Sequence, residues 1–125
     1  MARQNDLAVK EIMMTAPVTL SPEDTLDLAN DIIYLGRVRH IPVVENGLLV
    51  GVLSQRDLFR AAATIVLGLK GKTKKALLKS AKIKDVMTKT VITITRDTGV
   101  KEAARKMAEK KIGCLPVLES GSLVG

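Results

Sequence analysis

The chain has 125 residues, of which 46% are hydrophobic and 26% are charged, a balance typical of one folded domain or of two small units sharing a core. Aromatic residues make up only 2%, so the core must be aliphatic, and a base-stacking surface for nucleic acids is disfavoured. The single Cys114 and the single His40 exclude an intrachain disulfide and a four-ligand zinc site.

The sequence predicts no membrane-spanning or secretory segment. It contains no run of 18 or more apolar residues, and no apolar stretch follows the charged N-terminus. We therefore expect a cytoplasmic protein without a membrane partner. We find neither a catalytic dyad nor a metal-ligand cluster, so we expect no enzymatic activity, no metal and no required cofactor.

The net charge of +7 belongs to one central segment. Residues 58–84 contain eight basic residues and no acidic residue, whereas the other 98 residues contain 12 basic and 13 acidic residues. Such a segment is typical either of a solvated surface or of a surface that attracts polyphosphates or nucleic acids.

The first predicted elements are a short apolar strand at residues 18–20 and a helix at residues 24–36. Asp24 and Thr25 are good helix caps, apolar residues then recur with the helical period, and Gly36 is typical of a helix end. We therefore expect one face of this helix to lie against the core.

A hairpin and a second helix follow. Two apolar strands at residues 40–44 and 48–53 flank an Asn46-Gly47 turn, which is a strong signal for a hairpin. The next helix is expected at residues 54–69. Its latter half is apolar nearly all round, which favours burial on several sides, either within this chain or against a partner chain.

The same order of elements recurs in the second half of the chain. Residues 20–51 align with residues 94–125 without a gap, at an offset of 74, with 8 identities in 32 positions. Upstream, Met14-Thr15 aligns with Met87-Thr88 at an offset of 73, which implies a one-residue insertion or deletion. An internal repeat of this length predicts two copies of one structural unit.

The second copy predicts a strand at residues 91–94, a helix at 98–110 and a second hairpin around Ser120-Gly121. It ends at the position equivalent to Gly51, so we expect a truncated chain that lacks the last helix of the second copy. The predicted organisation is residues 1–69 with the N-terminal segment and first repeat, a lysine-rich linker at 70–82, and the second repeat at 83–125, together one compact module.

The repeat resembles the CBS domain, the regulatory repeat of the cystathionine β-synthase type. One motif is Gly51-Val52-Leu53-Ser54-Gln55-Arg56-Asp57, which matches the family's Gly, two apolar residues, Ser or Thr, two variable residues and Asp. The resemblance covers about residues 9–69 and 82–125. Its other motifs are Ile12-Met13-Met14-Thr15 and Val86-Met87-Thr88, which open the copies, and the strands His-Ile-Pro-Val-Val at 40–44 and Cys-Leu-Pro-Val-Leu at 114–118.

The resemblance implies both a fold and a function. The fold is α/β (α+β), with two β-α-β-β-α repeats packed sheet to sheet in pseudo-twofold symmetry and the second repeat lacking its last helix. The function is regulatory: binding of AMP, ADP, ATP or S-adenosylmethionine in the cleft between the repeats, with signalling to an unidentified regulated protein. Such pairs commonly form homodimers.

A candidate ligand site lies at residues 54–57, where a strand ends and a helix begins, because backbone amides and the helix dipole there favour a phosphate. The Ser54 hydroxyl can donate to a phosphate or sugar oxygen, and Arg56 can bind a phosphate. An ionised Asp57 can accept from two ribose hydroxyls. The same spacing is typical of a helix-capping box, an alternative compatible with ligand contact.

The family resemblance implies further contacts. It assigns Asp57 to the ribose and Ser54 to the ribose-phosphate region. It places the adenine against Thr15, Ala16, Pro17 and Val18, with Ile41 and Pro42 forming part of an apolar wall. A second, incomplete half-site would contain Lys89, Val91, Leu115 and Pro116.

Two other functions stay open on the sequence alone. One is nucleic-acid binding through Arg60 and the linker lysines, and the other is a purely structural dimerisation module. His40 could face the cleft, but a single His on a strand is more often a surface or capping residue. Cys114, at the matching place in the second copy, is expected to be a small buried core residue.

Overall fold

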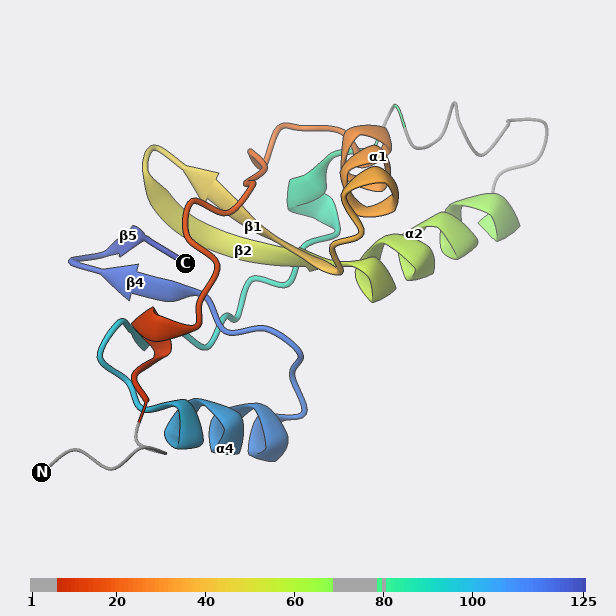
Figure 1. Ribbon diagram of the computed structural model, residues 1–125. Helices are drawn as coiled ribbons and strands as arrows, with labels where there is room; N and C mark the ends of the chain where they lie inside the picture. Colours follow the sequence, from red (N-terminus) through yellow and green to blue (C-terminus); the bar gives the residue numbers. More distant parts are fainter. Residues whose placement is uncertain (1–6, 69–78, 80) are drawn as a thin grey trace, which may run out of the picture.

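The computed structural model describes residues 7–68, 79 and 81–125 of the chain. Two similar units follow one another, each with a short 3₁₀ turn (η), a helix and a tight hairpin (Figure 1). This arrangement confirms the predicted mixed α/β fold. The first unit contains η1 (Val9–Glu11), α1 (Leu26–Gly36), β1 (His40–Glu45), β2 (Leu48–Ser54) and α2 (Gln55–Gly68). The second contains η2 (Ile83–Asp85), β3 (Ile94–Thr95), α4 (Val100–Lys110), β4 (Val117–Glu119) and β5 (Ser122–Leu123).

Both hairpins form where their turn residues predict them. Between β1 and β2, Asn46 and Gly47 have positive φ angles of 52° and 79°. Two-residue hairpin turns need this left-handed geometry, which Asn and Gly adopt at low cost. Ser120 and Gly121 repeat it between β4 and β5, with φ angles of 50° and 83°. The hairpins are therefore equivalent in the two units.

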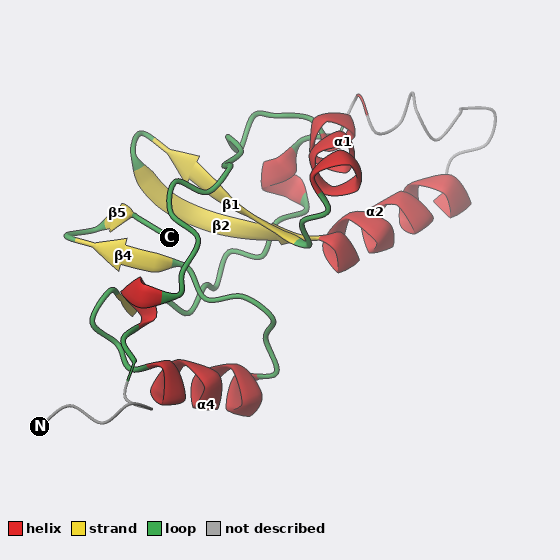
Figure 2. Cartoon of the chain, in the orientation of Figure 1, coloured by secondary structure: helices red, strands yellow, loops and turns green. Residues whose placement is uncertain are grey.

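Each unit adds a parallel strand contact beside its hairpin. Leu20 bridges to Val43 in the first unit, and Ile94 of β3 pairs with Val117 of β4 in the second. These pairs occupy equivalent positions in the alignment of 20–51 with 94–125. The two sheets contact each other through β2 and β5, with the helices to their outer sides (Figure 2). The predicted sheet-to-sheet pair is confirmed.

The opening segment of each unit packs in the core of the other unit. Ile83 of η2 is fully buried in the first core, in the same cluster as Leu26. Val9 of η1 is buried in the second core, in the same cluster as Val117. The two units thus exchange their opening segments, and neither core is complete without residues from the other unit.

The offset that relates the two repeats holds for these opening segments too. The Val9 N–H donates to the Thr98 carbonyl at 2.8 Å, and the Ile83 N–H donates to the Asp24 carbonyl at 2.8 Å. The two donors are 74 residues apart in the sequence, and so are the two acceptors, which is the offset of the gapless alignment. The alignment offset of 73 that Met14-Thr15 suggested is therefore not found. The backbone hydrogen bonds show an offset of 74 for the opening segments, so the identity of Met14-Thr15 with Met87-Thr88 does not mark equivalent positions.

Two glycines show the same equivalence where the repeats touch. A Cβ atom at Gly51 would lie 2.7 Å from the Met87 Sδ, and one at Gly125 would lie 2.6 Å from the Met13 Sδ. Met13, and not Met14, is thus the structural counterpart of Met87. Both glycines lie where two chain segments approach too closely for a side chain.

Among the described side chains of α2, one face packs against the core of its own chain. The predicted burial on several sides included burial against a partner chain, and that part stays a prediction. Leu58 and Ala62 are buried, whereas Phe59 and Leu67 are 76% and 88% exposed. Ala63 is also exposed and lies between Phe59 and Leu67 at a spacing of four. Residues four apart share a helix face, so α2 presents an apolar stripe away from its own core.

Most of the predicted basic linker at 70–82 lies outside the described residues. At its end, Lys82 and Lys84 pair with Glu23, with Nζ–Oε distances of 2.6 and 2.9 Å. Their hydrogen bonds, led by that from Lys82, lower the pKa of Glu23 to about 2. These lysines join η2 to the turn before α1. The division at residues 69 and 82 stays a prediction.

Candidate functional site

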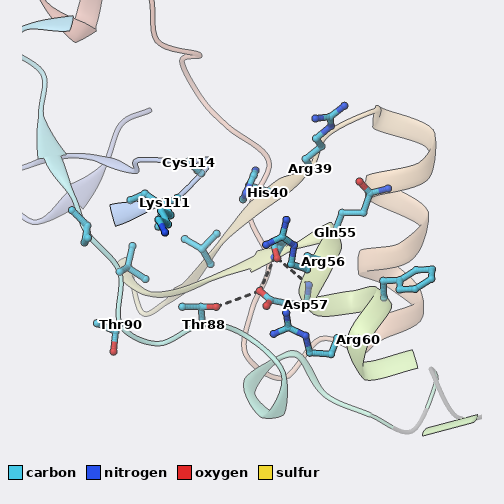
Figure 3. Close-up of a pocket in the computed structure, with 17 residues that line it drawn as sticks. Arg39, His40, Gln55, Arg56, Asp57, Arg60, Thr88, Thr90, Lys111 and Cys114 are labelled. Carbon is cyan, nitrogen blue, oxygen red and sulfur yellow. Dashed lines mark hydrogen bonds between the residues drawn. The ribbon is translucent and has the colours of Figure 1, made fainter. Parts of the chain in front are cut away.

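A cleft of about 740 Å³ opens between the two units beside the start of α2 (Figure 3). The start of β1, the end of β2 and the first turns of α2 form one side. The segment after η2 and the segment between α4 and β4 form the other. The lining residues are Arg39, His40, Val52, 54–57, Phe59, Arg60, Thr88, 90–92 and 111–114.

Ser54 and Asp57 form a reciprocal cap at the start of α2. The Ser54 N–H donates to the Asp57 Oδ2 at 3.1 Å, and the Asp57 N–H donates to the Ser54 Oγ at 3.0 Å. The capping alternative is therefore confirmed. It leaves ligand contact open, because Ser54 uses its oxygen as an acceptor and keeps the hydroxyl proton for another partner.

Thr88 connects this cap to the other unit. Its Oγ1 donates to the Asp57 Oδ2 at 3.3 Å, as Figure 3 shows. Its backbone pairs with Val52, with N–O distances of 3.0 and 2.9 Å. The two units are therefore joined at the cleft itself, so a ligand bound here would contact both.

Basic side chains outnumber acidic ones around the cleft. Arg39, Arg56, Arg60 and Lys111 line it, and Asp57 is the one carboxylate among the lining residues. Within the described ranges, none of these four cations forms a salt bridge. The cleft therefore favours an anionic ligand.

His40 lies in the cleft wall rather than at a fully exposed surface. It is partly buried, and a Cβ atom at Gly113 would lie only 3.0 Å from its Cε1. Burial lowers the pKa of His40 below its usual value of 6.5, although Asp57 acts in the opposite direction. The imidazole is therefore neutral at pH 7.

Cys114, the repeat counterpart of His40, also lines the cleft and is partly buried. Burial raises the pKa of its thiol, which favours the protonated thiol over the thiolate. The expectation of a buried core residue is therefore wrong: Cys114 is only partly buried, belongs to neither core cluster and lines the cleft.

The structure brings together only part of the predicted site. Ser54, Arg56 and Asp57 line the cleft together, and Val91 joins them from the supposed second half-site. Ile41 is only 1% exposed within the first core, so it has no surface to offer a ligand. The predicted residues that do not line this cleft are Thr15, Ala16, Pro17, Val18, Ile41, Pro42, Lys89, Leu115 and Pro116.

The exchange of opening segments explains the difference. The sequence prediction joined Ser54 to the opening segment of its own repeat, at 15–18. In the structure, the segment at 88–92 of the other repeat lies beside Ser54, through the Val52–Thr88 bridge. Thr88, Thr90 and Ile92 were therefore missed. Arg39 and Lys111, which lie outside the opening segments, were missed as well. The internal repeat is the sequence feature that relates to the missed residues at 88–92. When two copies exchange their opening segments, the opening segment of each copy lies beside the hairpin of the other copy.

The described residues contain no group of three or more His, Cys, Asp or Glu side chains arranged to hold a metal ion. Across these same ranges, each helix is too short or too polar to cross a membrane.

The geometry defines a pair of interlocked repeats, and the sequence pattern of the CBS domain matches residues 9–64 and 83–125. The chain belongs to the CBS domain family. It is 31% identical over 118 residues to the CBS domain-containing protein YhcV of Bacillus subtilis, with 94% of this chain and 77% of that protein covered. CBS domain pairs are regulatory modules.

Solved structures show the same fold. A putative acetoin utilization protein (AcuB) from Vibrio cholerae is 33% identical with a TM-score of 0.81, covering 96% of this chain and 82% of that one. The CBS domain pair of MJ0100, in complex with 5′-methylthioadenosine and S-adenosylmethionine, is 27% identical with a TM-score of 0.78 and covers 95% and 86%. CBSX2 in complex with AMP is 27% identical with a TM-score of 0.76 and covers 94% and 87%.

Proposed function

We propose that this CBS domain pair binds an adenine nucleotide, or another adenosine derivative, in the cleft between its repeats and signals its presence to a partner protein. The observation that carries the proposal is the position of Asp57, whose carboxylate lies in the cleft beside Ser54 and in contact with Thr88. The ligands of the MJ0100 and CBSX2 structures support this class of ligand.

Each side of the cleft has a role in this proposal. Asp57 accepts from the ribose hydroxyls, and the Ser54 hydroxyl donates to a sugar or phosphate oxygen. Arg56 binds phosphate through its planar guanidinium. The half-buried side chains of Ile92 and Ile112 provide an apolar wall for the adenine.

Signalling follows from the place of the cleft between the units. A ligand that contacts α2 and the 88–92 segment together stabilises one relative arrangement of the repeats. A partner that recognises this arrangement then responds to ligand concentration. We propose this regulatory role in place of catalysis. Nucleic-acid binding through Arg60 and the linker lysines, and a cytoplasmic location, stay predictions.

Isothermal titration calorimetry with AMP, ADP, ATP and S-adenosylmethionine tests the proposal. We expect at least one of them to bind. We also expect Asp57→Asn to weaken that binding by about tenfold or more, because hydrogen bonds to a charged group are stronger than those to a neutral group. Asn keeps an oxygen for the Ser54 N–H, so the cap of α2 is retained.

Asp24→Asn is the matched control. Asp24 accepts the N–H of Ser21 at 2.7 Å with the same three-residue spacing, but it does not line the cleft. We expect this variant to bind like the wild type. Absence of binding by all four compounds, or equal binding by the Asp57→Asn variant, would contradict the proposal.

We further propose that the chain forms a homodimer through α1 and α2. Tyr34 and Leu35 near the end of α1 are 81% and 78% exposed, and Phe59 and Leu67 of α2 are exposed to a similar degree. The two helices contact each other. In this proposal their exposed apolar residues together form the interface.

A further inference from the structure

The cations of the cleft come from three separate places in the chain. Arg56 and Arg60 lie one turn apart on α2, on the same side of the cleft as Asp57. Arg39 precedes β1, and Lys111 follows α4 in the other unit. Figure 3 shows Lys111 on the side of the cleft opposite Arg56 and Arg60. A ligand between them therefore meets positive charge on both sides.

Some cations outside the cleft have carboxylate partners. Lys10 pairs with Asp97 at 3.1 Å, and Arg96 pairs with Glu119 at 3.1 Å. Asp57, the one carboxylate among the residues that line the cleft, is engaged by Ser54 and Thr88. The excess positive charge of the cleft is thus not neutralised within the described part of the protein.

We propose that the cleft selects its ligand by phosphate charge, so that ATP binds more tightly than ADP, ADP more tightly than AMP, and S-adenosylmethionine most weakly. This inference rests on the proposed function. With the ribose at Asp57, the first phosphate meets the arginines of α2, and a longer phosphate chain extends to Lys111. S-adenosylmethionine instead brings a sulfonium cation into a cleft that already has a surplus of cations.

Lys111 gives the sharpest test, because it should contribute only to ligands with a longer phosphate chain. Its backbone is left-handed, with φ of 54°, a conformation that Asn tolerates well. Lys111→Asn therefore removes the charge without straining the end of α4. The matched control is Arg37→Asn: Arg37 is the repeat counterpart of Lys111, has φ of 53° and does not line the cleft.

The experiment is calorimetric titration of the full chain with AMP, ADP, ATP, 5′-methylthioadenosine and S-adenosylmethionine, in EDTA and at two salt concentrations. We expect Lys111→Asn to weaken ATP binding by about fivefold, the effect of one partly exposed charge pair, and to leave AMP binding unchanged. Arg37→Asn should change neither. Higher salt should weaken ATP binding more than AMP binding.

Two results would overturn the inference while the proposed function stands. One is tighter or equal binding of AMP or S-adenosylmethionine relative to ATP, and the other is an equal effect of Lys111→Asn on AMP and on ATP. If none of the five compounds binds to the wild-type chain, the proposed function fails and the inference fails with it.

Discussion

At the scale of single residues, His40 has the most unusual environment in the cleft. It is partly buried against Gly113, with Arg39 and Asp57 as the charged groups that act on its titration. Burial is the larger effect and lowers the pKa of His40 below 6.5. The folded protein therefore binds fewer protons at this site than the unfolded chain does.

This lowered pKa predicts a loss of stability in mild acid. When the pH falls below the unfolded value of 6.5, the unfolded chain takes up a proton that the folded protein resists, so the free energy of unfolding decreases. Chemical denaturation at about pH 7.5 and about pH 5.5 should show a larger decrease for the wild type than for His40→Gln. An equal decrease in both would contradict the assigned environment.

The sequence predicted some residues of the cleft and not others, for a physical reason. Ser54 and Asp57 were predicted because cap chemistry and a ligand contact need the same residue types at the same spacing. Thr88 belongs to the motif Val86-Met87-Thr88, but neither this motif nor any local pattern at Lys111 assigned a ligand contact to these two residues. Their role depends on which segments the tertiary packing brings together, and a single sequence does not encode that in a short motif.

At the scale of elements, the prediction for α2 stays partly open. Its composition predicted burial on several sides, by its own chain or by a partner chain, and Phe59 and Leu67 are largely exposed in the single chain. The composition of a helix shows that it is apolar, but not whether its own chain or a partner chain covers its apolar residues. In contrast, local turn chemistry was sufficient for the hairpins, because Asn46 and Gly47 favour the required φ angles on their own.

The exposed stripe of α2 predicts a dimer that one charge disrupts. Leu67→Lys should lower the dimer fraction measured by size-exclusion chromatography with light scattering, because it places a charge in an apolar interface. Leu48→Lys is the matched control, since Leu48 is 59% exposed but lies at the start of β2. A monomeric wild type, or equal dimer fractions in both variants, would contradict the proposed interface.

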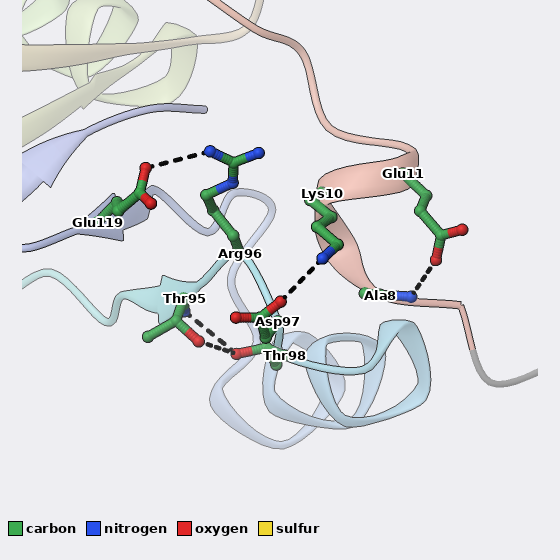
Figure 4. Close-up of polar contacts among 8 residues, drawn as sticks. All are labelled: Ala8, Lys10, Glu11, Thr95, Arg96, Asp97, Thr98 and Glu119. Atoms are coloured by element: carbon green, nitrogen blue, oxygen red, sulfur yellow. Dashed lines mark hydrogen bonds and ion pairs between the residues drawn. The ribbon is translucent and has the colours of Figure 1, made fainter. Parts of the chain in front are cut away.

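At the scale of the whole molecule, the exchange of opening segments organises the protein. Equivalent ion pairs support it on both sides: Lys10 of η1 pairs with Asp97 (Figure 4), and Lys84 of η2 pairs with Glu23. The two pairs are related by the same offset as the repeats themselves. Because each unit holds part of the other, a ligand in the cleft acts on the pair and not on one repeat.

The central claim is that the ligand binds between exchanged segments. Amide chemical-shift changes in an NMR titration of the ¹⁵N-labelled chain with ATP test it most directly. We predict the largest changes at residues 54–57, 88–92 and 111–114, and little change at 15–18. Changes concentrated at 15–18, with none at 88–92, would contradict the account.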